Sequence, residues 1–417
     1  MKSLLLSRYS VLLILSLALL VRLAALFVVD SISHPELWEY EEIANNLLEG
    51  EGLHFTFMGV RYQNTAMILY PLICAGIYLL TEHSFLAVKF FQIAISLLGC
   101  FMVYKIAARI FGNKVAIVAL ALVSFHPGLV VFSVRLHALT LDIVLFAMAV
   151  YFFILLLEGK EVVKYGLLAG VFIGAAMLTR STIALTIPIA MTALFVKMKS
   201  TDGKLIRSLL SMSIGIFIIL SPLFIRNNAV FGKPFILPND SAPNFWAGNN
   251  PNSVGTGKVL DGKSVFTAMP RDLRKRIEMA DEFEQRGLFY GAAYDFIKTN
   301  PQDALKLFFR KFYYFWWVTP TQGQDYPIAW FKLYKAYYSL VAIAAMVGLS
   351  RGIKILSGHN KEALFVVLLF CLTIAIAQSL YCVEGRHRWS IEPFILIFAA
   401  NGVTTIKERL FSRGSYA

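Results

Sequence analysis

An acidic stretch at residues 36–52 combines the residue types and the spacing that acid–base chemistry needs. It reads Glu-Leu-Trp-Glu-Tyr-Glu-Glu-Ile-Ala-Asn-Asn-Leu-Leu-Glu-Gly-Glu-Gly, and its apolar residues recur at helical spacing. We predict an amphipathic helix that begins near Pro35 and ends before Gly50, since proline favours the first helical turn and glycine the position after the last. Because a long apolar run precedes it, its carboxylates would lie on a membrane surface. We interpret the stretch as the catalytic loop of an enzyme embedded in a bilayer.

Arginines fall in the short loops that are predicted to face the same side as this stretch. They are Arg61, Arg135, Arg180, Arg386 and Arg388. Arginine presents a planar fork that matches phosphate oxygens in pairs, whereas lysine acts as a point charge. The pattern therefore favours a lipid phosphate or pyrophosphate site, above all at Arg386 and Arg388. The alternative is that these arginines bind ordinary anionic headgroups or pair with Glu39, Glu41 and Glu42.

The elements that would position these groups are membrane-spanning helices. Of the 417 residues, 58% are hydrophobic, against about 45–50% in a soluble domain. The predicted fold class is an all-α polytopic membrane protein. The net charge of +13 could indicate nucleic acid, but many basic residues sit in short loops between apolar runs, as the positive-inside rule describes. We therefore expect a membrane, and no nucleic acid, as partner.

The basic loops set the predicted topology. Lys2 and Arg8 precede the first apolar run, which places the N-terminus in the cytoplasm and keeps this run as a first helix. About ten spans follow from the length of the apolar runs, near residues 9–29, 85–104, 115–134, 138–157, 165–179, 181–196, 206–225, 333–350, 362–382 and 391–406. The piece 66–80 is short for a span and contains Pro71, so we expect it to dip into or lie along the outer leaflet. Both termini are predicted to be cytoplasmic, in an inner or plasma membrane.

The spans divide the chain into three predicted regions. Residues 1–226 form a catalytic transmembrane module that includes the outer loop 30–84, residues 227–328 form one large, mainly helical extracytoplasmic loop, and residues 329–417 carry the last helices. The cysteines lie in apolar runs without metal-ligand spacing, so we expect them to pack in the core. The sequence indicates no cofactor, and the use of a divalent metal stays open.

Three charged residues, Arg22, Asp142 and Glu36, could have a structural role instead of a catalytic one. Arg22 lies inside the first span, where a cation is costly, and Asp142 could be its partner or that of Arg135. For Asp142, an intramembrane ion pair is at least as well supported as a catalytic role. Glu36 could merely close a helix N-terminus, since Ser33 and Glu36 have the spacing of a capping box.

Several motifs, in order along nearly the whole chain, resemble those of one family. They are Glu36 four residues before Tyr40, then Ile43-Ala44, Asn46-Leu47-Leu48 and Gly50-Glu51-Gly52; Tyr70-Pro71; Leu178-Thr179-Arg180; Arg226-Asn227 with Phe231-Gly232; Phe245 to Pro251; and Glu384-Gly385-Arg386-His387-Arg388 followed by Glu392-Pro393. The sequence resembles the GT-C membrane glycosyltransferases, specifically the bacterial relatives of dolichyl-phosphate-mannose protein mannosyltransferase and of the lipid A aminoarabinose transferase. It departs from the family where Glu36 replaces an Asp, where His387 replaces a Tyr and where Asp142 replaces a frequent Glu.

The resemblance implies an enzyme that moves a hexose or pentose from a polyprenyl-phosphate donor to a glycan, lipid or protein acceptor on the outer face, as in lipopolysaccharide synthesis or protein O-linked glycosylation. Glu36 would be the general base that deprotonates the acceptor hydroxyl, and cations would stabilise the departing phosphate. Direct attack would invert the anomeric carbon. The substrate-binding residues that the resemblance implies are Tyr40, Arg61, Arg180, Asn249, Asn250, Glu384, Arg386, His387 and Arg388. Asn249 and Asn250 could instead serve the turn before Pro251.

Two other classes of protein stay open. A transporter or flippase for lipid-linked sugars would also have many spans, but the sequence shows no evident internal repeat, and the acidic outer helix has no clear use in such a protein. A non-catalytic member of an envelope-assembly complex is compatible with the departure at Glu36. Release of free polyprenyl phosphate would distinguish an enzyme from a scaffold, and movement of the donor without its consumption would indicate a transporter.

Overall fold

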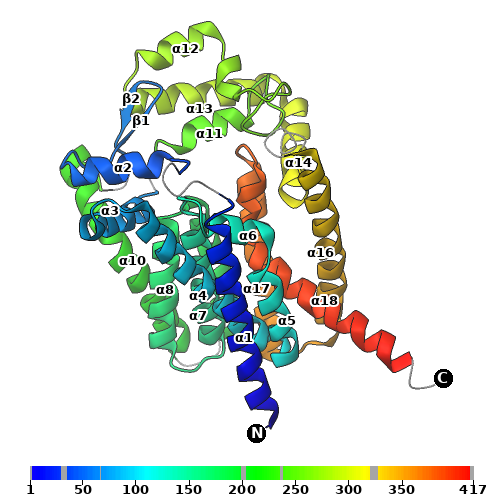
Figure 1. Ribbon diagram of the computed structural model, residues 1–417. Helices are drawn as coiled ribbons and strands as arrows, with labels where there is room; N and C mark the ends of the chain where they lie inside the picture. The colour runs from blue at the N-terminus through cyan, green and yellow to red at the C-terminus, as the bar shows by residue number, and fades with distance from the viewer. Residues whose placement is uncertain are drawn as a thin grey trace.

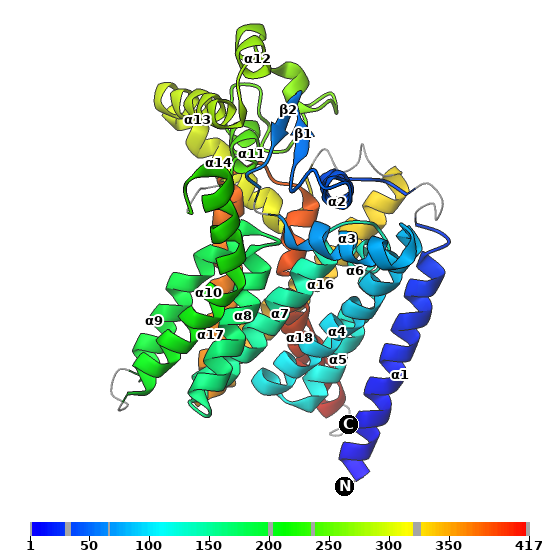
Figure 2. The ribbon, with the colours of Figure 1, turned by 90° about the vertical axis from the view of Figure 1, so that its left-hand side faces the viewer.

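The computed structural model describes residues 2–29, 35–65, 67–198, 203–234, 238–319 and 327–413. Long helices pack side by side into one bundle (Figure 1). Shorter helices and a two-stranded hairpin cover one end of this bundle (Figure 2). We call this the capped end, and the cap consists of the hairpin at 55–62 and residues 238–319. The first helix begins and the last helix ends at the opposite end of the bundle (Figures 1 and 2).

Most of the long helices are apolar enough to cross a membrane. Six described segments meet this criterion: α4 (Phe85–Phe111), α7 (Leu139–Leu157), Ser181–Met198, which joins η1 (Ser181–Leu185) to α9 (Thr186–Met198), α10 (Lys204–Phe231), α16 (Ile328–Ile355) and α17 (Gly358–Ser379). Shorter apolar helices accompany them: Tyr9–Ala25 within α1 (Lys2–Ala25), α3 (Leu69–Thr81), α5 (Asn113–Ser124) and α8 (Val162–Met177). The last helix, α18 (Glu392–Arg413), completes the bundle. The chain is thus an all-α, multi-pass membrane protein, as predicted.

The predicted span 115–134 is divided in the structure. α5 ends at Ser124, and a short helix, α6 (Pro127–Phe132), follows it. Proline disfavours helical backbone in the residue before it, and His126 is accordingly extended, with φ −64° and ψ 121°. The residues from 133 to 138 therefore form an irregular turn before α7. This turn, and not the end of a long helix, carries Arg135 and His137.

Helix α3 lies beside α2 (Glu39–Leu48) at the capped end in both views (Figures 1 and 2). Glu41 of α2 is buried, and both of its carboxylate oxygens accept from the Tyr78 hydroxyl of α3, at 2.7 and 2.8 Å. The rings of Tyr40 and Tyr70 meet edge to face, with centroids 5.3 Å apart. These contacts fix α2 on α3. That the segment 66–80 dips into or lies along the outer leaflet stays a prediction.

The acidic helix begins later than predicted. α2 starts at Glu39 instead of near Pro35, and Trp38 is its N-cap residue, in an extended conformation. Glu36 therefore lies three residues before the helix and outside its first turn, which argues against the capping-box interpretation. Ser33, the other member of that capping box, lies outside the described residues. Just past the helix, Gly50 adopts a φ of +80°, a conformation that favours glycine.

Glycines let α16 and α18 approach closely. A Cβ atom added to Gly348 would overlap the Phe398 carbonyl oxygen, and one added to Gly402 would overlap the Ala344 carbonyl oxygen. Close backbone contact at small residues is a common mode of helix packing in membranes. Because α18 is fixed in this way, the short helix η3 (Gly385–Ser390) that precedes it is also held in place.

The cap has a small core of its own. Its elements are β1 (Phe55–Phe57) paired antiparallel with β2 (Val60–Tyr62), α11 (Ser241–Gly248), η2 (Val265–Ala268), α12 (Arg271–Glu278), α13 (Glu282–Thr299) and α14 (Pro301–Trp316). Trp246 of α11 and Phe289 of α13 are buried in this core, and Phe57 of the hairpin packs against them. The predicted boundary at residue 226 falls inside α10, which continues to Phe231.

A buried carboxylate joins the hairpin to α13. Glu282 Oε2 accepts from the backbone N–H groups of Gln63, at 3.0 Å, and Asn64, at 3.1 Å. Next to it, the Tyr62 hydroxyl donates to Oε1 of Gln285 at 2.7 Å. The hairpin loop between α2 and α3 is therefore joined to the later large loop at the capped end.

Candidate functional site

Four segments that are far apart in the sequence meet at the capped end: the residues leading into α2, the turn before α7, the end of α8, and η3. The Arg386 guanidinium of η3 lies over the Trp38 ring, 4.7 Å from its centroid. Trp38 meets His137 edge to face at 5.1 Å, and His137 meets Tyr40 at 5.4 Å. A cation over an indole face is attracted by the ring quadrupole. The start of the acidic stretch and the late arginine motif thus lie side by side.

Two carboxylates border this group. The Glu36 side chain is 52% exposed, and its Oε2 lies 3.5 Å from Nη1 of Arg135. Glu39 is partly buried, and burial raises the pKa of its carboxyl above the ordinary 4.5, an effect that its own backbone N–H and the charge of Arg386 oppose. Glu39 is therefore the carboxylate that the charge of Arg386 reaches, while Glu36 pairs with Arg135.

Arg180 approaches the same group from the end of α8. Its Nε donates to Oδ2 of Asp142 at 2.6 Å, and the Asp142 side chain is buried. Within the described ranges, the two terminal nitrogens of Arg180 form no hydrogen bond. Asp142 therefore pairs with Arg180, which corrects the prediction that its partner is Arg22 or Arg135.

Arg22 is buried among neutral acceptors instead. Its Nε donates to Ser96 Oγ at 2.7 Å, and its Nη1 donates to the backbone carbonyl oxygens of Ala18, at 3.1 Å, and Ser124, at 3.0 Å. As expected for a cation inside a span, it faces protein. It ties α1 to α4 and α5 and takes no part in the group around Trp38.

The positive charges of Arg180 and Arg386 shift the pKa values of the same three side chains. Burial lowers the pKa of His137 and of His387 well below the ordinary 6.5, and the charges of Arg386 and Arg180 lower both further. Burial raises the pKa of Tyr40, and the same two charges oppose this rise. The charges of Arg180 and Arg386 therefore both reach Tyr40, His137 and His387, and the carboxylates of Asp142 and Glu384 pair with these two arginines.

Residues next to Arg386 hold η3 in shape. Glu384 Oε2 lies 2.9 Å from Nη2 of Arg386. The Glu384 backbone N–H donates to Nδ1 of His387 at 3.1 Å, and Nε2 of Gln378 lies 3.1 Å from the same ring nitrogen. Glu384 is thus a partner of Arg386, and His387 has a fixed ring orientation.

Arg388 does not join Arg386. It is buried, its Nε donates to Oε2 of Glu392 at 2.7 Å, and its Nη2 donates to the Tyr334 hydroxyl at 2.9 Å. Its guanidinium also covers the Tyr338 ring, 3.7 Å from the centroid. These partners surround the guanidinium, so the structure gives no support to the predicted phosphate-binding role of Arg388, which stays a prediction. Arg388 ties η3 to α16 and α18.

Asn249 and Asn250 are buried and bound to protein groups. Asn249 Nδ2 donates to the Leu380 carbonyl at 2.8 Å, and its Oδ1 accepts from Nζ of Lys311 at 2.9 Å. Asn250 Nδ2 donates to the Trp246 carbonyl at 2.9 Å. The expected contact of these amides with sugar hydroxyls is therefore not supported, and the alternative, a role in the turn that ends α11, describes them better.

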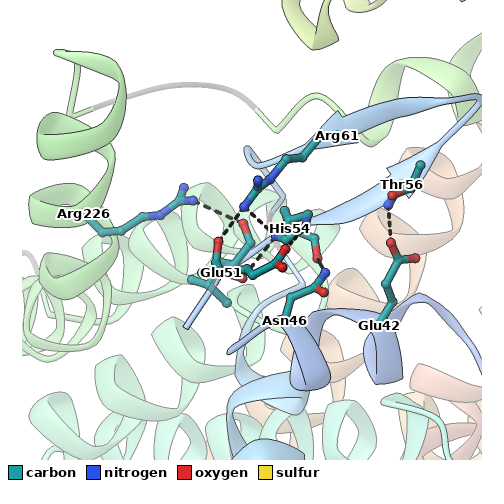
Figure 3. Close-up of polar contacts among 9 residues, drawn as sticks. Glu42, Asn46, Glu51, His54, Thr56, Arg61 and Arg226 are labelled. Carbon is teal, nitrogen blue, oxygen red and sulfur yellow. Dashed lines mark hydrogen bonds and ion pairs between the residues drawn. The ribbon is translucent and has the colours of Figure 1, made fainter. Parts of the chain in front are cut away.

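Arg61 belongs to a separate polar cluster at the hairpin (Figure 3). It donates through Nη2 to the Glu51 carbonyl oxygen and to Nδ1 of His54, the latter at 3.1 Å. Arg226 of α10 reaches the same loop, and its Nη2 donates to the Leu53 carbonyl at 3.3 Å. In the described part of the chain, Arg61 makes no contact with the arginines of the site. It shapes the loop between α2 and β1.

Three residues of the site were not predicted as site residues from the sequence, namely Trp38, Glu39 and His137. Trp38 and Glu39 stand directly after the motif residue Glu36, and His137 stands between Arg135 and Asp142, but no spacing singles any of them out. The described residues contain no group of three or more His, Cys, Asp or Glu side chains that could hold a metal ion. The cysteines are buried and unpaired in the core.

Part of the chain matches a known family. Residues 66–225 match the family model described as dolichyl-phosphate-mannose-protein mannosyltransferase. This match includes Arg135, Asp142 and Arg180, but it leaves out Glu36 and Arg386. No curated protein sequence matches the chain.

Solved structures share the architecture. The archaeal oligosaccharyltransferase AglB from Archaeoglobus fulgidus, in complex with an inhibitory peptide and a dolichol-phosphate, is similar with a TM-score of 0.57 and 12% identity, over 98% of this chain and 52% of that chain. ArnT from Cupriavidus metallidurans, bound to undecaprenyl phosphate, is similar with a TM-score of 0.56 and 15% identity, over 94% of this chain and 60% of that chain. The chain spans about half the length of AglB.

The fold that these comparisons define is that of the GT-C membrane glycosyltransferases. The chain has this GT-C fold, as the sequence motifs predicted. Within it, the segment from residue 66 to residue 225 is similar to the mannosyltransferase family named above.

Proposed function

We propose that the chain is an integral-membrane glycosyltransferase that moves a sugar from a polyprenyl-phosphate donor to an acceptor on the extracytoplasmic face. The observation that carries this proposal is the contact of Arg386 with Trp38 and of Trp38 with His137, next to Glu36 and Glu39, in a group that the charge of Arg180 also reaches. AglB and ArnT, which share the fold, hold dolichol-phosphate and undecaprenyl phosphate in their solved complexes. A lipid phosphate is the anion that suits this group.

The two arginines would bind the phosphate of the donor and stabilise it as it departs. Asp142 holds Nε of Arg180 at 2.6 Å, and this bond orients the terminal nitrogens as a fork. Trp38 and Glu384 orient Arg386 in the same way, one through its ring and the other through an ion pair of 2.9 Å. Preorganised cations cost no rearrangement when charge develops on the leaving group.

The general base would be a carboxylate at the start of the acidic stretch. Glu36 is our first candidate because its half-exposed carboxylate is open to an acceptor that arrives from water. Glu39 is the second candidate, since a carboxyl whose pKa is raised by burial takes a proton more readily. The other carboxylates of the site, Asp142 and Glu384, pair with Arg180 and Arg386. We therefore propose that the acceptor attacks directly, which would invert the anomeric carbon.

The donor sugar is proposed to be a hexose or pentose, and the acceptor a glycan, lipid or protein of the cell envelope. The capped end would face outward, with both termini in the cytoplasm, because basic loops such as those at Lys114 and Lys160 lie at the other end of the helices. The cap would then cover the site on the side from which the acceptor comes.

A turnover experiment tests this function. Purified protein would be incubated with undecaprenyl phosphate that carries a labelled hexose or pentose, with and without an extract of envelope acceptors. We expect release of free undecaprenyl phosphate that depends on the acceptor and is lost in the Arg386→Gln variant. Transfer of intact donor across a vesicle membrane without its consumption would overturn the proposal in favour of a transporter, and the absence of both release and transfer would overturn it in favour of a scaffold.

A further inference from the structure

In two histidines of the site, a backbone hydrogen bond determines which ring nitrogen carries the proton. The Leu139 backbone N–H donates to Nδ1 of His137 at 3.0 Å, and the Glu384 backbone N–H donates to Nδ1 of His387 at 3.1 Å. A ring nitrogen that accepts a hydrogen bond carries no proton, so in the neutral ring the proton is on the other nitrogen. Both rings therefore present an Nε2–H donor.

The surroundings keep both rings neutral. Nδ1 of His387 has a second neighbour, Nε2 of Gln378 at 3.1 Å. If the ring took up a second proton, that proton would be on Nδ1 and would face the donors that already point at this nitrogen. Arg386 and Arg180 also disfavour further positive charge on either ring, as does Arg135 in the case of His137. At neutral pH the two imidazoles are uncharged donors.

The two histidines belong to the group around Trp38 that the charges of Arg180 and Arg386 reach. His137 is 6% exposed, and its ring is held between Trp38 and Tyr40. Neither Nε2 atom has a hydrogen-bond partner among the described residues. Neither Nε2 atom is among the fully buried polar atoms of the described residues that lack a partner, so a ligand with acceptor oxygens can reach both donors.

We infer that His137 and His387 donate their Nε2–H groups to the phosphate oxygens of the lipid donor, alongside the guanidinium groups of Arg180 and Arg386. This inference rests on the proposed function and names further residues that bind the substrate. Neutral donors suit a site that already holds two cations, because they add hydrogen bonds without adding repulsion between like charges. The related motif has a tyrosine at position 387, and a tyrosine also supplies a neutral donor. The histidine at this position therefore keeps a neutral hydrogen-bond donor but places it differently.

Matched variants at each position separate the two ring nitrogens. Asparagine reaches only as far as Nδ1, so His387→Asn keeps an acceptor for the Glu384 N–H and removes the Nε2–H donor. Glutamine reaches as far as Nε2, so His387→Gln keeps a donor there and removes the Nδ1 acceptor. The same pair applies at His137, where asparagine can still accept from the Leu139 N–H because an Asx turn has this geometry.

The readout is the binding of undecaprenyl phosphate to the purified full-length protein in detergent, with thermal unfolding as a measure of the fold. We expect His387→Asn and His137→Asn to bind about tenfold more weakly than wild type, as the loss of one hydrogen bond to a charged group implies. Each glutamine variant should bind within about threefold of wild type but unfold at a lower temperature.

Unchanged binding by both asparagine variants, or weaker binding by the glutamine variants alone, would overturn the inference and leave the histidines a structural role. If either asparagine variant fails to fold, the pair at the other histidine decides. Wild-type protein that binds no undecaprenyl phosphate would overturn the proposed function itself, so the two failures are distinguishable.

Discussion

The Arg386 guanidinium lies over the Trp38 indole, 4.7 Å from the ring centroid. This contact joins the residue just before α2 to the short helix between α17 and α18, across most of the chain. Neither residue lies within the matched segment from 66 to 225. The site is therefore completed by the two flanks of that segment, and Trp38 fixes the plane of the arginine that we propose for phosphate binding.

The two candidate bases can be told apart by their amide variants. Glu36→Gln and Glu39→Gln each keep the shape of the side chain and remove the proton acceptor. We expect the variant at the true base to lower the rate of sugar transfer by about a hundredfold to ten-thousandfold, and the other to have a much smaller effect.

The pH dependence of the rate adds a second criterion. Burial raises the pKa of the Glu39 carboxyl, and a base must be deprotonated to act. If Glu39 is the base, the rate falls as the pH drops through this raised pKa, at a pH above the ordinary 4.5, and Glu39→Gln loses that acid limb. Full activity of both variants would exclude Glu36 and Glu39 as the base.

Lys311 is predicted to stabilise the junction between the cap and the bundle. It is buried, and its Nζ donates to the Gly248 carbonyl at 3.0 Å and to Asn249 Oδ1 at 2.9 Å. Lys311→Met leaves these acceptors unpaired, so we expect it to lower the free energy of unfolding by about 1–3 kcal/mol. Lys306→Met, on an exposed lysine of the same helix, is the control and should unfold like wild type.

The contribution of Lys311 should also depend on pH. Burial lowers its pKa from 10.5 to about 8 in the folded protein. Between these values the unfolded chain binds more protons than the folded protein, so the stability that Lys311 contributes rises with pH over this window. The difference in unfolding temperature between wild type and Lys311→Met should grow from pH 8 to pH 10. A constant or shrinking difference would contradict this assignment.

Glu282 is predicted to couple the hairpin to α13. Its Oε2 accepts from the backbone N–H groups of Gln63 and Asn64, and Glu282→Gln weakens both bonds because it removes the negative charge of the acceptor. We expect faster hydrogen exchange at these two amides than in wild type. Asp295→Asn, which changes an exposed carboxylate on the same helix, should leave the exchange unaltered, and equal exchange in both variants would contradict the coupling.

The orientation in the membrane can be measured with single cysteines, since the native cysteines are buried. Lys298→Cys places a thiol on the exposed surface of the cap, and Lys160→Cys places one in the exposed turn between α7 and α8. In spheroplasts, a membrane-impermeant maleimide should label position 298 and reach position 160 only after lysis. The reverse pattern would contradict an outward-facing cap.

The fold could be predicted from the sequence because its signals are local. Apolar runs of sufficient length and basic loops between them define most of the helices, and the order of the motifs indicated the GT-C fold. The start of α2 could not be predicted, because the extended conformation of Trp38 accompanies contacts with Arg386 and His137, which are distant in the sequence.

The site was predicted in part, for a similar reason. Arg386 and Arg388 are two residues apart, and in a helix of about three residues per turn they point in different directions. The sequence does not say which of the two faces the ligand. Glu392 lies only four residues after Arg388, but Tyr334 is distant from Arg388 in the sequence, as Lys311 and Leu380 are from Asn249. No local pattern could show that these more distant groups occupy the two polar side chains.

Binding of undecaprenyl phosphate to purified wild-type protein and to its Arg386→Lys variant tests the central claim most directly. Lysine keeps the charge but loses the planar fork and the flat face that covers Trp38. We expect affinity about tenfold weaker for Arg386→Lys. Arg109→Lys should bind like wild type, because Arg109 pairs with Glu158 at 2.7 Å at the end of the bundle opposite the cap. Equal affinity of wild type and Arg386→Lys would contradict the central claim.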